Sequence, residues 1–191
     1  MAFEPQTRFL LRGSALLICL LTFWWFVLLG PMLYLLKGAA GVFLSIEESA
    51  SGGWTLRVPF EKTLPPTPQQ PVARQIRSID FDMPRGDAIT FLFSLPVYWA
   101  IILAAPGVRR NFRPLVVGTL VMSAAEIALL LGFAELTALS AASEWTGDGY
   151  FAEWVRQVGV YLIVNALPYA APFMVAISLH RELRSEVFGE G

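Results

Sequence analysis

The sequence predicts an all-α membrane protein of four transmembrane helices, with a small β-rich periplasmic loop domain between helices 1 and 2. Of its 191 residues, 55% are hydrophobic and 15% are charged, and the mean hydropathy is +0.57. This composition leaves too little polar surface for a water-soluble domain of this size. The uncharged residues fall in four stretches, each long enough as a helix to cross a hydrocarbon core of about 30 Å.

The first two stretches are separated by the largest polar segment of the chain. The first covers the 24 residues from Gly13 to Leu36. It is longer than the apolar core of a signal peptide and does not end in small residues, so we expect it to stay in the mature chain as a helix. The second runs from Ala88 to Val108, and Pro96 in its middle predicts a kink that neighbouring helices stabilise.

The other two stretches carry polar residues inside them. The third runs from Pro114 to about Ala142 and is interrupted by Glu126 and Glu135. The fourth runs from Gln157 to Leu179 and contains one asparagine and two prolines. Both have the length of one crossing, which completes the four predicted spans.

Positive charges beside the spans predict the orientation. Seven arginines flank the spans on one side of a four-helix layout, namely Arg8, Arg12, Arg109, Arg110, Arg113, Arg181 and Arg184. Because short loops rich in Lys and Arg stay in the cytoplasm, both termini are expected there. The predicted layout is a cytoplasmic N-terminus and first helix (1–37), a periplasmic cap (38–87), three further helices (88–180) and a cytoplasmic tail (181–191). Arg109, Arg110 and Arg113 are also candidates for anionic lipid headgroups, although topology alone requires a basic turn there.

The periplasmic cap is expected to be a small antiparallel sheet. Residues 42–48, 54–58 and 75–82 read as strands, although Ile76 lies one step out of register with Ile79 and Phe81. Gly52-Gly53 is a hairpin signal. Residues 64–71 include four prolines and predict an extended, mobile arm. A cap with so little apolar area to bury should pack against the helix ends or against a partner protein.

Glu126 is the most informative single residue, because burying a carboxylate near the bilayer centre costs several kcal/mol of free energy unless the group is neutral, paired or in contact with water. At 1.5 Å per residue, three other polar residues fall at a comparable depth on neighbouring helices. The predicted intramembrane polar cluster is Glu126, Asn165, Tyr169 and Ser94. Such a cluster either joins helices, at about 0.6–2 kcal/mol per hydrogen bond, or forms a proton or substrate site.

Several function classes are excluded or lack support. The net charge of −1 gives no basic footprint for nucleic acid. One cysteine and one histidine cannot form an internal disulfide or a four-ligand zinc site, so no metal is expected. Cys19 lies within the first span and His180 at the cytoplasmic end of the last, too far apart for a nucleophilic pair. No nucleotide or hydrolase motif occurs, so neither a catalytic residue nor a cofactor is predicted.

Some segments resemble a known family. They are the basic N-terminus before Phe23-Trp24-Trp25-Phe26, the strand Thr55-Leu56-Arg57-Val58, the span from Leu95-Pro96 into Ala104-Ala105-Pro106-Gly107, and Leu167-Pro168-Tyr169-Ala170-Ala171-Pro172. In layout and in these mostly apolar motifs, the chain resembles the exosortase H-associated membrane proteins of Gram-negative bacteria.

This resemblance implies an inner-membrane accessory that accompanies an exosortase, a multi-spanning cysteine protease acting on substrates with a C-terminal sorting signal. It carries over no catalytic residue. We therefore expect a non-enzymatic protein that contacts membrane lipids and docks the exosortase-like protease or its substrate. The candidate docking residues are Trp24, Trp25, Trp54 and Arg57. The alternative is a small transporter or membrane-enzyme subunit that uses the polar cluster around Glu126.

Overall fold

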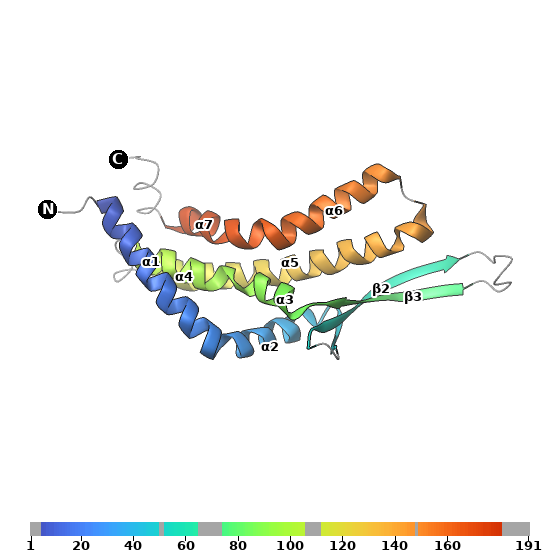
Figure 1. Ribbon diagram of the computed structural model, residues 1–191, viewed down its shortest axis with the longest axis horizontal. Helices are drawn as coiled ribbons and strands as arrows, with labels where there is room; N and C mark the ends of the chain where they lie inside the picture. The colour runs from blue at the N-terminus through green and yellow to red at the C-terminus, as the bar shows by residue number, and fades with distance from the viewer. Residues whose placement is uncertain (1–4, 50–51, 65–73, 106–111, 148, 181–191) are drawn as a thin grey trace.

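A computed structural model describes residues 5–49, 52–64, 74–105, 112–147 and 149–180. Over these residues the chain forms seven α-helices, one π-helical turn and a three-stranded sheet (Figure 1). In chain order the elements are α1 (Pro5–Phe23), η1 (Trp24–Leu28), α2 (Leu29–Ala40), β1 (Ser45–Glu48), β2 (Trp54–Leu64), β3 (Arg74–Met83), α3 (Arg85–Leu92), α4 (Ser94–Ala104), α5 (Arg113–Thr146), α6 (Tyr150–Asn165) and α7 (Leu167–Leu179).

Three helical segments are long and apolar enough to cross a membrane. They are Leu10–Ala40, Arg85–Ala104 and Arg113–Ser143. A fourth crossing requires α6 and α7 to be counted as one span, although the chain bends by 62° between them. The structure is therefore compatible with a membrane protein. The first and third predicted stretches fall within Leu10–Ala40 and Arg113–Ser143, whereas the second, predicted to end at Val108, ends as a helix at Ala104, and residues 106–108 lie outside the described residues.

Breaks interrupt three of the four apolar stretches. The second breaks at Phe93, between α3 and α4, because Pro96 has no N–H to donate to the carbonyl of Leu92 four residues earlier. The predicted kink thus lies just before the proline. The fourth breaks at Ala166, two residues before Pro168. The first contains the π-helical turn η1, which the sequence pattern did not predict and which ends at Leu28, two residues before Gly30-Pro31 in the first turn of α2.

Helix α4 lies at the centre of the helical layer. It packs against α1, α5 and α7, and most of its side chains are buried. Helix α4 is apolar on all sides, as expected for a helix that is surrounded by other elements. The N-terminal end of α1 and the C-terminal ends of α4 and α7, here called their outer ends, lie together at one end of the molecule. The sheet lies toward the other end (Figure 1).

The predicted antiparallel sheet is confirmed, but its strand bounds differ: β1 is shorter than the predicted 42–48, whereas β2 and β3 are longer than the predicted 54–58 and 75–82. The order is β1-β2-β3, and the β1–β2 turn contains Gly52 at φ +80°, which suits a residue without a Cβ. A register shift places two residues of β2 between Pro59 and Lys62 opposite the single residue Arg77 of β3, so that Lys62 pairs with Ile76. Most of the predicted proline-rich arm (65–71) lies outside the described residues, since β2 includes Leu64.

The sheet and the helices share one hydrophobic core. This agrees with the prediction that the cap packs against the helices. Phe133 of α5 joins them, because its ring lies 6.1 Å from the ring of Phe81 on β3 and 5.8 Å from that of Phe91 on α3. Leu56 and Ile79 bury their side chains in the same cluster. This packing fixes the sheet on the helical layer.

Candidate functional site

Glu126 caps the start of α4, inside the interrupted apolar segment Arg85–Ala104. It lies near the middle of α5 and is 2% exposed. Ser94 Oγ donates a hydrogen bond to Glu126 Oε1 at 2.5 Å, and the backbone N–H of Leu95 donates a second one. Both donors belong to the start of α4, where backbone N–H groups have no partner within the helix. The carboxyl group therefore satisfies the helix end that the break exposes.

The structure brings only part of the predicted polar cluster together. Ser94 and Glu126 form the hydrogen-bonded pair. Tyr169 is half exposed, and its ring lies 5.9 Å from that of Phe93, whereas Asn165 is exposed at the end of α6. Among the described residues, no hydrogen bond joins Asn165 or Tyr169 to Glu126. The prediction treated the fourth stretch as a straight helix, and the bend at Ala166 changes which face its residues present.

The side chain of Glu126 is enclosed by the residues around it. Four cavities are lined by described residues, and Glu126 lines none of these four. A buried carboxyl group that accepts hydrogen bonds from two donors on another helix has the properties of a helix-joining contact.

Further hydrogen bonds between α4 and α5 were missed by the sequence analysis. Tyr98 donates its hydroxyl to the carbonyl of Pro114 at 2.5 Å, and Trp99 donates Nε1–H to Thr119 Oγ1 at 2.9 Å. Gly118 lies against the Tyr98 ring, with no room for a Cβ. The available signal was the pair Gly118-Thr119, a small and a polar residue typical of helix–helix contacts within membranes.

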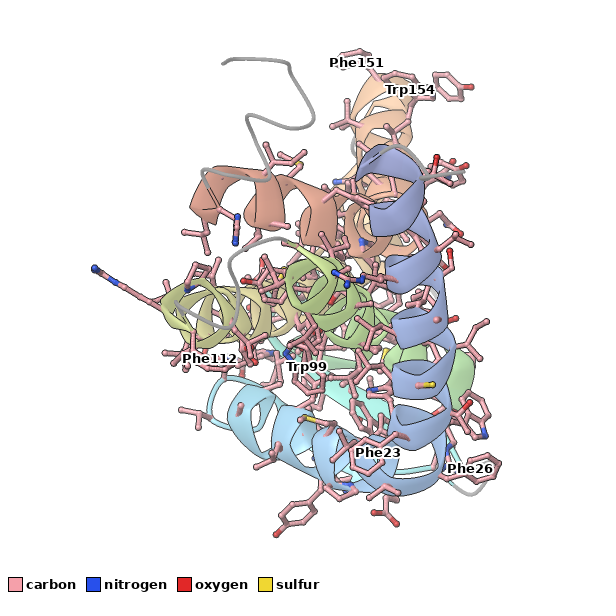
Figure 2. The ribbon with its side chains drawn as sticks, turned by 90° about the vertical axis from the view of Figure 1, so that its left-hand side faces the viewer. Phe23, Phe26, Trp99, Phe112, Phe151 and Trp154 are labelled. Carbon is pink, nitrogen blue, oxygen red and sulfur yellow. The ribbon has the colours of Figure 1, made fainter. Side chains whose placement is uncertain are left out.

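Two of the four candidate docking residues are internal, which corrects that expectation. Trp24 is 1% exposed and packs edge-on against Phe93, and Trp54 is buried between the sheet and the helices. Trp24 cannot contact a partner without rearrangement, and Trp54 reaches the surface only where it lines a groove beside α2. Trp25 is exposed at the bend of the first span, where Figure 2 also shows Phe26 pointing away from the helices.

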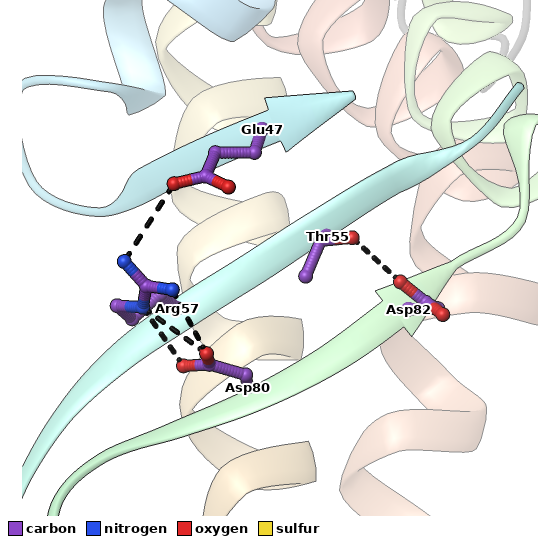
Figure 3. Close-up of polar contacts among 5 residues, drawn as sticks. All are labelled: Glu47, Thr55, Arg57, Asp80 and Asp82. Atoms are coloured by element: carbon purple, nitrogen blue, oxygen red, sulfur yellow. Dashed lines mark hydrogen bonds and ion pairs between the residues drawn. The ribbon is translucent and has the colours of Figure 1, made fainter. Parts of the chain in front are cut away.

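Arg57, the fourth candidate, lies in a charged face on the outer side of the sheet (Figure 3). Its Nε and Nη2 donate to the two carboxylate oxygens of Asp80 at 3.0 Å each, and its Nη1 lies 3.6 Å from Glu47 Oε1. Thr55 Oγ1 donates to Asp82 Oδ1 at 2.6 Å. Successive residues of a strand point to opposite sides, so these polar residues alternate with the apolar ones that enter the core. We call Glu47, Thr55, Arg57, Asp80 and Asp82 the outer face.

The Arg57–Asp80 pair predicts a pH dependence. Hydrogen bonds from Arg57 lower the pKa of Asp80 below its ordinary value of 3.8. A carboxyl group whose pKa is lowered on folding contributes stability above its unfolded pKa and loses it as the pH falls through the folded pKa. We expect the unfolding midpoint of the wild type to fall below about pH 4, and Asp80→Asn to remove part of that fall. Thermal unfolding in detergent at pH 6 and pH 3 measures this, with Asp87→Asn as the control.

The other site predictions concern basic residues near the opposite end. Arg113 is exposed at the start of α5, as a headgroup contact requires, whereas Arg109 and Arg110 lie outside the described residues. His180 is buried directly after α7, where its N–H bonds the carbonyl of Ala176.

Comparison of the chain with protein-family models, with curated proteins and with solved structures found no match.

Proposed function

We propose that this protein is a non-enzymatic accessory of the bacterial inner membrane that docks an exosortase-like protease, or the protease's substrate, on the outer face of its sheet. The observation that carries the proposal is the rigid display of a charged surface. The apolar side of the sheet is fixed to α5 through Phe81 and Phe133, while the opposite side presents Arg57 among the carboxylates of Glu47 and Asp80. Charge patterns of this kind select partners more than they add affinity.

The same proposal includes four spans with both termini in the cytoplasm. It is supported by the three apolar helical segments and by the bent α6–α7 pair as a fourth. It is also supported by the position of the outer ends of α1, α4 and α7 together, away from the sheet (Figure 1). In this topology the sheet faces the periplasm, where a sorting protease would meet its substrates.

Site-specific photocrosslinking in bacterial membranes tests the docking surface. A photoreactive amino acid at Thr55 or Asp82 should give an adduct with a multi-spanning cysteine protease or with a protein bearing a C-terminal sorting signal. The matched control places the same amino acid at Phe112, which is exposed at the far end of the helical layer, and should give no such adduct. Adducts from Phe112 alone, or none from the outer face when both candidate partners are co-expressed, would remove the basis of the proposal.

The transporter or enzyme-subunit alternative is favoured by one observation. Transporters often place their sites at broken helices near the bilayer midplane, and Glu126 lies at such a break. The two donors on Glu126 and its 2% exposure favour a structural role over this alternative. The Glu126 variants described in the Discussion separate the two roles.

A further inference from the structure

A groove of about 370 Å³ lies where the first span meets the sheet. Its wall on the helical side is α2, including Leu33 and Tyr34. Its opposite wall is formed by the β1–β2 turn at Gly52-Gly53 and by Arg85 at the start of α3. The volume is within the range of small-ligand sites in proteins.

The groove is apolar at one end and cationic at the other. Leu33 and the exposed Tyr34 belong to the apolar helical segment Leu10–Ala40. One helical turn farther along α2, Lys37 lines the same groove. Arg85 faces it from α3, and its side chain has no hydrogen-bond or ion-pair partner among the described residues.

One carboxylate opposes these two cations. Lys37 Nζ lies 3.2 Å from Glu48 Oε1, and Glu48 also lines the groove. With two positive groups and one negative group, the cationic end has an excess charge of one. The positive charge that Glu48 does not balance can bind an anion.

Close backbone contacts fix the cationic end. A Cβ at Gly53 would collide with the carbonyl oxygen of Met83 and would lie 3.3 Å from the backbone nitrogen of Arg85. The turn therefore packs directly on the chain segment that carries Arg85. A preorganised wall of this kind reduces the ordering cost of binding.

We propose that this groove binds one anionic phospholipid, with the phosphate between Arg85 and Lys37 and an acyl chain along Leu33 and Tyr34. A guanidinium group matches the geometry of a phosphate and binds it through paired hydrogen bonds. The change from apolar to cationic lining along a single groove matches an amphiphile, whereas a soluble anion would use only the cationic end. The inference depends on the chain lying in a membrane, but not on the partner that the outer face docks.

Lipid titration of the full chain in detergent micelles, followed by native mass spectrometry, tests the inference. Phosphatidylglycerol should bind at least about tenfold more tightly than zwitterionic phosphatidylcholine, and Arg85→Gln should weaken phosphatidylglycerol binding about tenfold. Arg77→Gln is the matched control, because Arg77 is an exposed arginine of β3 that does not line this groove. It should change the affinity less than about twofold, which is below the effect of one charged hydrogen bond.

A second pair of variants has the opposite expected sign. Glu48→Gln removes the carboxylate that competes for Lys37 and should tighten phosphatidylglycerol binding about threefold. Glu47→Gln changes the neighbouring residue, which contacts Arg57 on the outer face, and should have no effect. Because a damaged fold would not bind more tightly, a gain confined to Glu48→Gln supports the site directly.

Three results would overturn the inference. The first is equal affinity for the two lipids. The second is a loss with Arg77→Gln as large as that with Arg85→Gln. The third is binding of glycerol phosphate as tight as that of the lipid, which would assign the groove to a soluble phosphate. None of these results bears on crosslinking from the outer face, so the two proposals fail independently.

Discussion

Glu126→Leu is expected to destabilise the protein by about 2–4 kcal/mol, whereas Glu126→Gln should cost less than about 1 kcal/mol. Leucine removes the acceptor for the Leu95 N–H and leaves the Ser94 hydroxyl only the carbonyl of Phe91, at 3.4 Å, and a buried donor without a good partner costs about 1–3 kcal/mol. Glutamine retains a carbonyl oxygen at the same position and can accept both bonds. Reversible unfolding in mixed micelles measures the difference.

Glu135→Leu is the control, because Glu135 is an exposed carboxylate on the same helix and should change stability by less than about 0.5 kcal/mol. If Glu126→Gln is as stable as the wild type but loses the biological activity of the protein, Glu126 acts as a titrating or ligand-binding group and the structural role assigned to it is wrong. If glutamine destabilises as much as leucine, hydrogen-bond acceptance does not explain the role of Glu126.

Gly118→Ala is expected to destabilise the protein by about 1–3 kcal/mol, although alanine is the better helix former by about 1 kcal/mol. The new methyl group would collide with the ring and hydroxyl of Tyr98. Tyr98 is fully buried and bonded to the carbonyl of Pro114, so it cannot move aside without losing that bond. The collision would push α4 and α5 apart at this contact, which unfolding measurements in the same micelles detect.

Gly38→Ala provides the matched comparison, since a Cβ at Gly38 of α2 meets no atom within 4 Å. It should be neutral or slightly stabilising. Combining Gly118→Ala with Tyr98→Leu should recover part of the loss relative to the sum of the two single changes, because the smaller side chain makes room for the methyl group. Strict additivity of the two changes would show that Tyr98 is not the source of the strain.

Local patterns identified the helical segments and the strands. The uncharged stretches marked the long apolar helices, because hydrocarbon excludes charged side chains whatever the arrangement of the helices. The alternation around Phe81 and the glycines at 52–53 marked the sheet, because strand periodicity and turn conformation depend on neighbouring residues. Pro96 predicted a kink in the second stretch, since the missing N–H is a local property, and the helix is interrupted three residues earlier, at Phe93.

Which polar groups meet could not be predicted in the same way. Depth along a straight helix placed Ser94, Asn165, Tyr169 and Glu126 at one level, but only Ser94 is bonded to Glu126 in the structure. The rotation of each helix about its axis depends on side-chain packing against distant segments, and the bend between α6 and α7 further changes the exposure of Asn165. The burial of Trp24 and Trp54, which were expected at a docking surface, depends on the same kind of packing. Trp24 packs against Phe93, and Trp54 belongs to the core that the sheet shares with the helices.

By itself, the sequence determined the apolar character of this protein, the position of its long helical segments and its antiparallel sheet, because solvent preference and backbone hydrogen bonding are set residue by residue. Only the tertiary structure decided that Glu126 closes the start of α4, that the sheet is fixed to α5 through Phe133, and that Lys37 and Arg85 face one groove. These arrangements depend on contacts between residues far apart in the chain, whose geometry is set by packing and is not encoded in any local pattern.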